Sequence, residues 1–90
     1  MAEMSQRLRA RLARDFPAPG SAPELIRLVE VASDSERVQA AIVLAARGDL
    51  GMIRHGVALA AEDWRDVLVN GGLENEDWPA VLDRELGPDH

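Results

Sequence analysis

The stretch that most constrains the fold is SERVQAAIVLAAR, residues 35–47, which contains neither glycine nor proline. On a helical wheel three of its polar residues, Glu36, Gln39 and Arg47, occupy a narrow sector. The apolar residues that cover most of the remaining surface are Val38, Ala41, Ile42, Leu44 and Ala45. A helix that is apolar on more than one side packs against several neighbours. The stretch therefore predicts a central helix, at about 35–47, that the rest of the chain surrounds.

The rest of the chain also has helical periodicity, since no segment alternates apolar and polar residues for long enough to predict a strand. Ninety residues, of which 47% are hydrophobic, suit one small globular domain. We therefore expect an all-α fold: a compact orthogonal bundle of five to six short helices around the central one. No apolar run approaches the ~18 residues of a membrane-spanning helix, and no signal-peptide pattern is present, so the expected location is the cytoplasm.

The first part of the chain has the pattern of an amphipathic helix over residues 3–15, which the FPAPGSAP segment at 16–23 ends. The apolar stripe of this helix is Met4, Leu8, Leu12 and Phe16. A basic cluster on a different side consists of Arg7, Arg11 and Arg14. We therefore divide the chain into residues 1–20, an N-terminal helix with a proline-rich linker, and residues 21–90, a helical domain. The linker is either a tight connection or a hinge that lets the first helix dock elsewhere.

Two capping-box spacings predict where later helices begin. Ser21 with Glu24 marks the start of a second helix, and Ser33 with Glu36 marks the start of the central helix.

A further helix is expected over residues 50–61, with Asp49 as its N-cap. Its main apolar face carries Leu50, Ile53, Val57, Ala60 and Ala61. Met52 and Leu59 lie nearly opposite, with His55 beside them. A helix with two apolar sides is either sandwiched in the core or reaches a partner.

The last third of the chain contains an internal repeat. Residues 62–68 and 76–82 share the pattern EDW-x-x-VL, and each places its acidic residues at the start of a predicted helix, where they complement the helix dipole. The two helices are expected at about 63–69 and 77–86. Trp64 and Trp78 are expected to pack near the central helix, one of them partly exposed; the alternative is that they form a hot spot on a binding surface.

Between the two copies of the repeat, Asn70-Gly71-Gly72 predicts a helix stop. Gly71 is expected to adopt a positive φ there, which glycine does at little cost.

The sequence EDWRDVLVNGGL followed by EDWPAVLD, after the VQAA of the central helix, resembles a family of short actinobacterial proteins of unknown function. The resemblance covers roughly residues 36–86. It implies a stand-alone small domain, and it brings with it no activity, cofactor or catalytic residue.

The composition excludes several kinds of chemistry. The absence of cysteine rules out thiol catalysis and zinc–thiolate sites, and the absence of lysine rules out Schiff-base chemistry. Glu62, Asp63 and Asp66 lie within one helical turn, seven residues or more after His55, but in no metal-binding spacing. We interpret these acidic residues as helix caps or as part of a solvent-exposed helix face. We therefore expect no catalytic residue, no metal and no cofactor, and a protein that is not an enzyme.

The charge is unevenly distributed. The net charge is −6, residues 1–15 carry +2, and residues 61–90 carry −7. The two ends should attract each other, either within one chain or between two. A net negative charge opposes general binding to nucleic acid or to an anionic membrane.

The favoured hypothesis is a protein-interaction or self-associating module without catalytic activity, with either another protein or a second copy as its partner. The apolar stripe of the first helix would lie in a groove formed by Met52 and Leu59, and its arginines would face C-terminal acids such as Asp83. The first alternative is a small regulatory nucleic-acid-associated protein that uses the N-terminal arginines. The second is a metal-dependent small enzyme.

Overall fold

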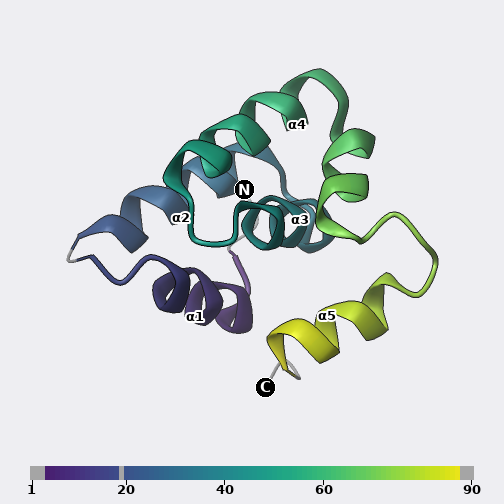
Figure 1. Cartoon of the computed structure of the whole chain (residues 1–90), viewed down its shortest axis with the longest axis horizontal. Coiled ribbons are helices and arrows are strands. Elements are labelled where there is room, and N and C mark those ends of the chain that lie inside the picture. Colours follow the sequence, from purple (N-terminus) through teal and green to yellow (C-terminus); the bar gives the residue numbers. More distant parts are fainter. Residues whose placement is uncertain (1–3, 19, 88–90) are drawn as a thin grey trace.

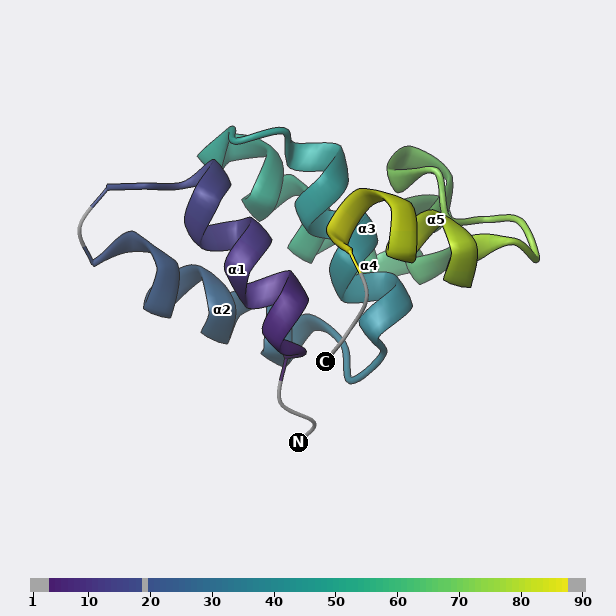
Figure 2. The ribbon, with the colours of Figure 1, turned by 90° about the horizontal axis from the view of Figure 1, so that it is seen from below.

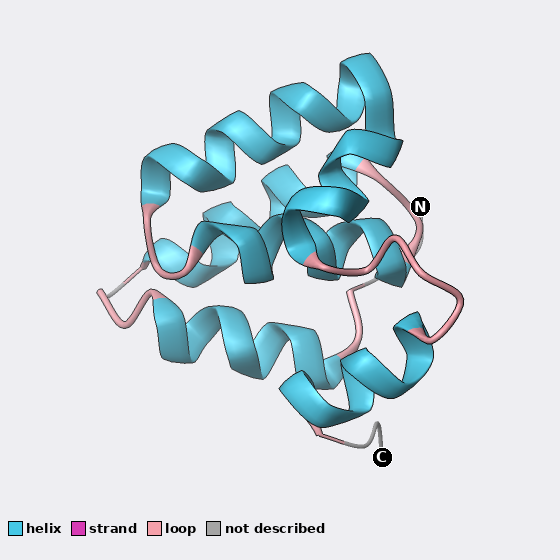
Figure 3. Cartoon of the chain, turned by 45° about the vertical axis from the view of Figure 1, so that its right-hand side comes forward, coloured by secondary structure: helices cyan, strands magenta, loops and turns pink. Residues whose placement is uncertain are grey.

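The computed structural model describes residues 4–18 and 20–87, and within these ranges every regular element is a helix (Figure 3). The helices are α1 (Gln6–Asp15), α2 (Ser21–Ala32), α3 (Glu36–Ala46), α4 (Leu50–Gly71) and α5 (Trp78–Leu86). The all-α prediction is confirmed, since the described chain forms a compact globule of five helices. No helix in these ranges is both long enough and apolar enough to cross a membrane.

The helix α3 lies at the centre of the molecule, with α4 on one side and α1 and α5 on the opposite side (Figure 1), and α2 lies beside α1 (Figure 2). Seven of its eleven residues are buried, so the predicted central helix is confirmed. Its only buried polar residue, Gln39, donates a hydrogen bond of 2.6 Å from Nε2 to the carbonyl of Ser33. This bond offsets the cost of placing an amide group in an apolar core.

The two helices expected at 50–61 and 63–69 are joined in α4, which bends sharply (Figure 1). The bend lies at Asp63, whose backbone is extended, with φ −154° and ψ 98°. Asp63 acts as an N-cap for the second arm, because its Oδ1 accepts a hydrogen bond of 3.1 Å from the backbone N–H of Arg65. A capping carboxylate, rather than proline or glycine, therefore restarts the helix in a new direction.

Two of the predicted helix starts are corrected by the structure. Ser21 is the first helical residue of α2, and the N-cap is Gly20, with φ 80° and no side chain to accept a bond. The N-cap of α3 is Ser35, whose Oγ accepts from the N–H of Val38 at 3.5 Å. Ser33 instead ends α2 and accepts from the N–H of Ser35, at 3.0 Å. A serine occupied at the end of one helix cannot also cap the next.

The other helix starts lie close to their predicted positions. The helix α1 begins at Gln6, later than expected, because Ser5 is its N-cap and accepts from the N–H of Leu8 at 3.4 Å. Residue 3, where the prediction began, lies outside the described residues. Asp49 caps α4 as predicted and accepts from the N–H of Met52 at 3.3 Å.

The helix stop at residues 70–72 is confirmed, but the expected role of Gly71 is wrong. The positive φ, 75°, belongs to Gly72, and Gly71 is the last residue of α4. At Gly71 the helix passes so close to α3 that a Cβ would lie 2.5 Å from Cα of Ala41 and 2.8 Å from its carbonyl oxygen. Glycine is needed here because two backbones meet, not because the chain turns.

Candidate functional site

The apolar stripe of α1 is packed inside the chain. Met4, Leu8, Leu12 and Phe16 belong to one buried cluster that also contains Ile42 of α3. The backbone N–H of Met4 donates to Oε2 of Glu30 on α2, at 2.8 Å. In this structure the stripe therefore offers a partner little exposed surface.

Arg7 links the two ends of the chain. Its Nε and Nη2 donate to the two carboxylate oxygens of Glu36, each at 3.0 Å, and its Nη1 donates to Oδ1 of Asp83 at 2.7 Å. The bidentate contact raises the pKa of Arg7 and lowers the pKa of Glu36 below its usual range. The attraction expected between the N-terminal arginines and the C-terminal acids thus occurs within one chain.

The other two arginines of the basic cluster differ from each other in exposure. Arg11 donates from Nε to Oδ2 of Asp15 and from Nη1 to the carbonyl of Glu85, both at 3.0 Å. Arg14 lies 3.7 Å from the Asp15 carboxylate, and its side chain is 71% exposed. Of the three predicted arginines, only Arg14 has most of its side chain in solvent.

Met52 and Leu59 line a small hollow where the first arm of α4 lies against α3, together with His55 and Gly56. Met52 is exposed and Leu59 is half-buried. No residue of α1 lines this hollow. The structure therefore does not bring these two residues to the apolar stripe of α1.

The internal repeat builds the same local unit twice. Asp63 and Asp77 each precede a helical segment, Trp64 and Trp78 are the first residues of those segments, and a buried Val-Leu pair follows in each. Trp78 is half-buried beneath the guanidinium of Arg37, which lies 5.3 Å from the ring centroid. Trp64 is 52% exposed, and both tryptophans line one hollow of about 530 Å³. The repeat therefore places two indoles at one surface site.

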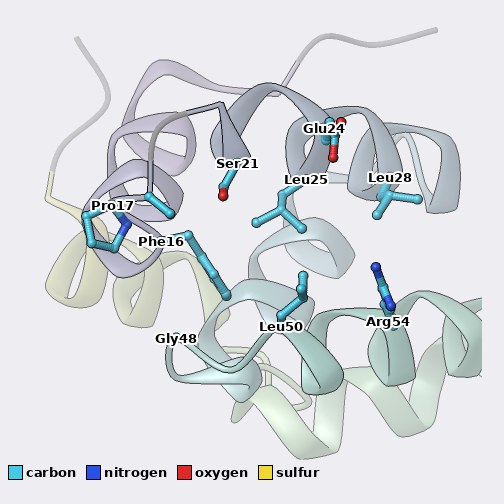
Figure 4. Close-up of a pocket in the computed structure, with 10 residues that line it drawn as sticks. Phe16, Pro17, Ser21, Glu24, Leu25, Leu28, Gly48, Leu50 and Arg54 are labelled. Atoms are coloured by element: carbon cyan, nitrogen blue, oxygen red, sulfur yellow. The ribbon is translucent and has the colours of Figure 1, made fainter.

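A groove lies between α2 and the first arm of α4, which run side by side in the same direction (Figure 1). The largest of its hollows, of about 570 Å³, lies at the N-terminal ends of both helices. There Leu25 and Leu28 of α2 face Leu50 and Arg54 of α4, and Phe16 closes one end (Figure 4).

Two more hollows follow along the same pair of helices. A hollow of about 390 Å³ shares Leu28 with the first and adds Arg27, Val31 and Val57. The hollow that holds Trp64 and Trp78 lies beyond it, at the far end of α2. We call these three hollows together the α2–α4 groove. Four of the six exposed large hydrophobic residues in the described chain lie along it: Leu28, Val31, Leu50 and Trp64.

The charged residues of the groove are few. Arg27 lines the middle hollow, Arg54 lines the largest one, Glu24 lines both, and Arg37 lines the hollow that holds the two tryptophans. Neither Arg27 nor Arg54 forms an ion pair with any acid in the described part of the chain. The described residues also contain no group of three or more metal-ligand side chains.

Comparisons of the chain with family models, curated proteins and solved structures gave no match. The resemblance to short actinobacterial proteins therefore stays a prediction.

The sequence analysis did not identify the α2–α4 groove. One signal for it was present: Val31 is an apolar residue on the side of α2 that carries Arg27 and Glu30. A second signal was Leu50, an apolar residue in the first turn of its helix, directly after the polar helix start at Asp49.

Proposed function

We propose that the protein is a protein-interaction module without catalytic activity, and that it binds a helical segment of another protein in the α2–α4 groove. The observation that carries the proposal is the clustering of exposed apolar residues along one groove. Exposed apolar side chains that gather in one groove, with polar residues at its rim, mark a candidate surface for a protein partner. A groove of apolar side chains between two helices is a common receptor for an amphipathic helix.

The length of the groove supports a helical occupant. The residues of α4 that line it run from Leu50 through Arg54, Val57 and Ala60 to Trp64. At about 1.5 Å per helical residue, the first arm of α4 from Leu50 to the bend at Asp63 is about 20 Å long, which matches a partner helix of about fourteen residues, and Trp64 follows directly after the bend. Trp64 and Trp78 at one end give the groove the aromatic side chains that often dominate binding energy.

The contacts of the N-terminal arginines favour this proposal over the nucleic-acid alternative. Arg7 and Arg11 are held by Glu36, Asp83 and Asp15 within the chain. A phosphate would have to compete with these carboxylates for the same guanidinium groups.

The test uses a displayed library of amphipathic helices of about fourteen residues, selected on the immobilised full-length protein. We expect the selected peptides to carry apolar residues at helical spacing and to compete with one another for one site. Their binding should be lost in Val31→Asp. The matched control is Val69→Asp, which makes the same change at a side chain 59% exposed and outside the groove.

Both valines are exposed, at 74% for Val31, so neither substitution should change the stability by more than about 0.5 kcal/mol. If no selected peptide distinguishes Val31→Asp from Val69→Asp, the α2–α4 groove is not the interaction site and the proposal is wrong.

A further inference from the structure

We infer that the helix bound in the α2–α4 groove is acidic: its apolar stripe is flanked by glutamate or aspartate residues that pair with Arg27 and Arg54. This inference rests on the proposed function and specifies the chemistry of the partner.

The first support is that Arg27 and Arg54 have no carboxylate partner among the described residues. Most arginines in the described chain contact a carboxylate, and Arg37 instead stacks on Trp78 and donates to the carbonyl of Leu73 at 2.9 Å. Arg27, Arg47 and Arg54 are exposed and have no such contact in the described residues, and of these three Arg27 and Arg54 line the groove. They stand on opposite walls, Arg27 on α2 and Arg54 on α4. A helix lying between them would have both guanidinium groups beside its apolar stripe.

The second support is the contrast with the rest of the molecule. The chain as a whole has a net charge of −6, whereas the three charged residues that line the largest and the middle hollow of the groove carry +1. Complementary charge at the rim of an interface selects the partner and speeds encounter more than it adds affinity. An acidic helix would be repelled by the net charge of the molecule and attracted by the two arginines of the groove.

The same charges disfavour a second copy as the occupant. A two-fold dimer would place this groove against itself, since the same patch is used by both subunits. Leu28 and Val31 of one copy would then enter the groove of the other copy beside its Arg27. The arginines of the two grooves would therefore lie in one interface, where like charges repel. Each copy would also carry the same net negative charge.

The experiment compares three peptides that share one apolar stripe taken from the selected library and that carry glutamate, glutamine or arginine at the flanking positions. Binding to the full-length protein is followed by the fluorescence of its own tryptophans, because Trp64 lies in the groove and the peptides contain none. With two exposed ion pairs, we expect the glutamate peptide to bind about fivefold to tenfold more tightly than the glutamine peptide at low salt. The difference should shrink as the salt concentration rises.

The second part of the experiment reverses the charge of the two arginines. Arg27→Glu/Arg54→Glu should reverse the preference, so that the arginine peptide binds most tightly. The control Arg14→Glu/Arg84→Glu changes the net charge by the same amount at two side chains that are each 71% exposed and outside the groove, and it should keep the preference for glutamate.

The outcomes separate this inference from the proposed function. If the three peptides bind equally and all of them lose binding in Val31→Asp, the inference of an acidic partner is wrong and the groove remains the binding site. An absence of groove-dependent binding would overturn both. A doubled mass of the full-length protein in light scattering, returned to the monomer by Val31→Asp, would identify a second copy as the occupant and overturn the inference.

Discussion

The substitution Gly71→Ala gives the sharpest test of the packing between α3 and α4. In an ordinary helix this change is stabilising by about 1 kcal/mol, because alanine has the better helix propensity. Here the added Cβ would lie 2.5 Å from Cα, 2.7 Å from Cβ and 2.8 Å from the carbonyl oxygen of Ala41. Carbon atoms in contact prefer separations of about 3.5–4.0 Å, so the helices would have to move apart by about 1 Å.

The cost of this movement should exceed the gain in helix propensity. Inserting a methyl group into a packed core costs about 1–3 kcal/mol when side chains can adjust, and two of the three contacts at Gly71 are with backbone atoms, which cannot rotate away. We expect a net loss near the upper end, about 2 kcal/mol. For a domain of this size that corresponds to a fall in Tm of about 10 °C.

The assay is urea unfolding followed by far-ultraviolet circular dichroism, with the midpoint and the m-value compared between variants. Gly72→Ala is the control, because a Cβ there meets nothing within 4 Å and only the positive φ of 75° is strained. It should lose about 1 kcal/mol. Ala41→Gly should not rescue Gly71→Ala, since the Cα and the carbonyl oxygen remain in place. A Gly71→Ala variant as stable as the wild type would show that the two helices do not approach this closely.

Three further predictions concern the core, the ion pair and the tryptophans. Ile42→Asp should abolish the cooperative melt, because an unpaired carboxylate would replace a fully buried side chain, whereas Ile42→Val should cost about 1 kcal/mol; a native melt for Ile42→Asp would refute the central position of α3. The pKa of Glu36 is lowered by its bonds to Arg7, so the stabilisation from this pair should be complete above about pH 4.5 and lost as the pH falls through the lower folded value. Acid titration of stability should therefore be shallower in Glu36→Gln than in the wild type, and parallel curves would count against the pair. Trp78→Ala should destabilise more than Trp64→Ala in thermal melts, because Trp78 is half-buried under a guanidinium and Trp64 is 52% exposed; the reverse order would contradict this placement.

The sequence was sufficient to predict the helical fold and its centre. The stretch at 35–47 has apolar residues on more than one side, so its burial follows from the pattern, and Asp49 and Asn70-Gly71-Gly72 are typical of a helix start and a helix stop. The caps at Ser21 and Ser33 were not predictable in the same way. Several candidate residues lie close together in the chain, and the choice between them depends on which helix uses each one.

The groove could not be predicted because it depends on the distance between two helices. The pattern of α2 shows which residues are apolar, but it does not show that Leu25 is buried and Leu28 is exposed beside the first arm of α4. The role of Gly71 has the same origin. A glycine after an asparagine predicts a turn, and only the position of Ala41 across the helix crossing reveals that the backbone there has no room for a methyl group.

The contacts of Arg7 also indicate how the chain could be circularly permuted. Its guanidinium reaches the carbonyl of Gly87 at 3.0 Å, so the beginning of α1 and the end of α5 are neighbours in space although nearly the whole sequence separates them. A short peptide could therefore join them, and new termini could be opened at the exposed residues 74–77 between α4 and α5. Such a circular permutant would keep every helix and the α2–α4 groove while making the first and last helices consecutive.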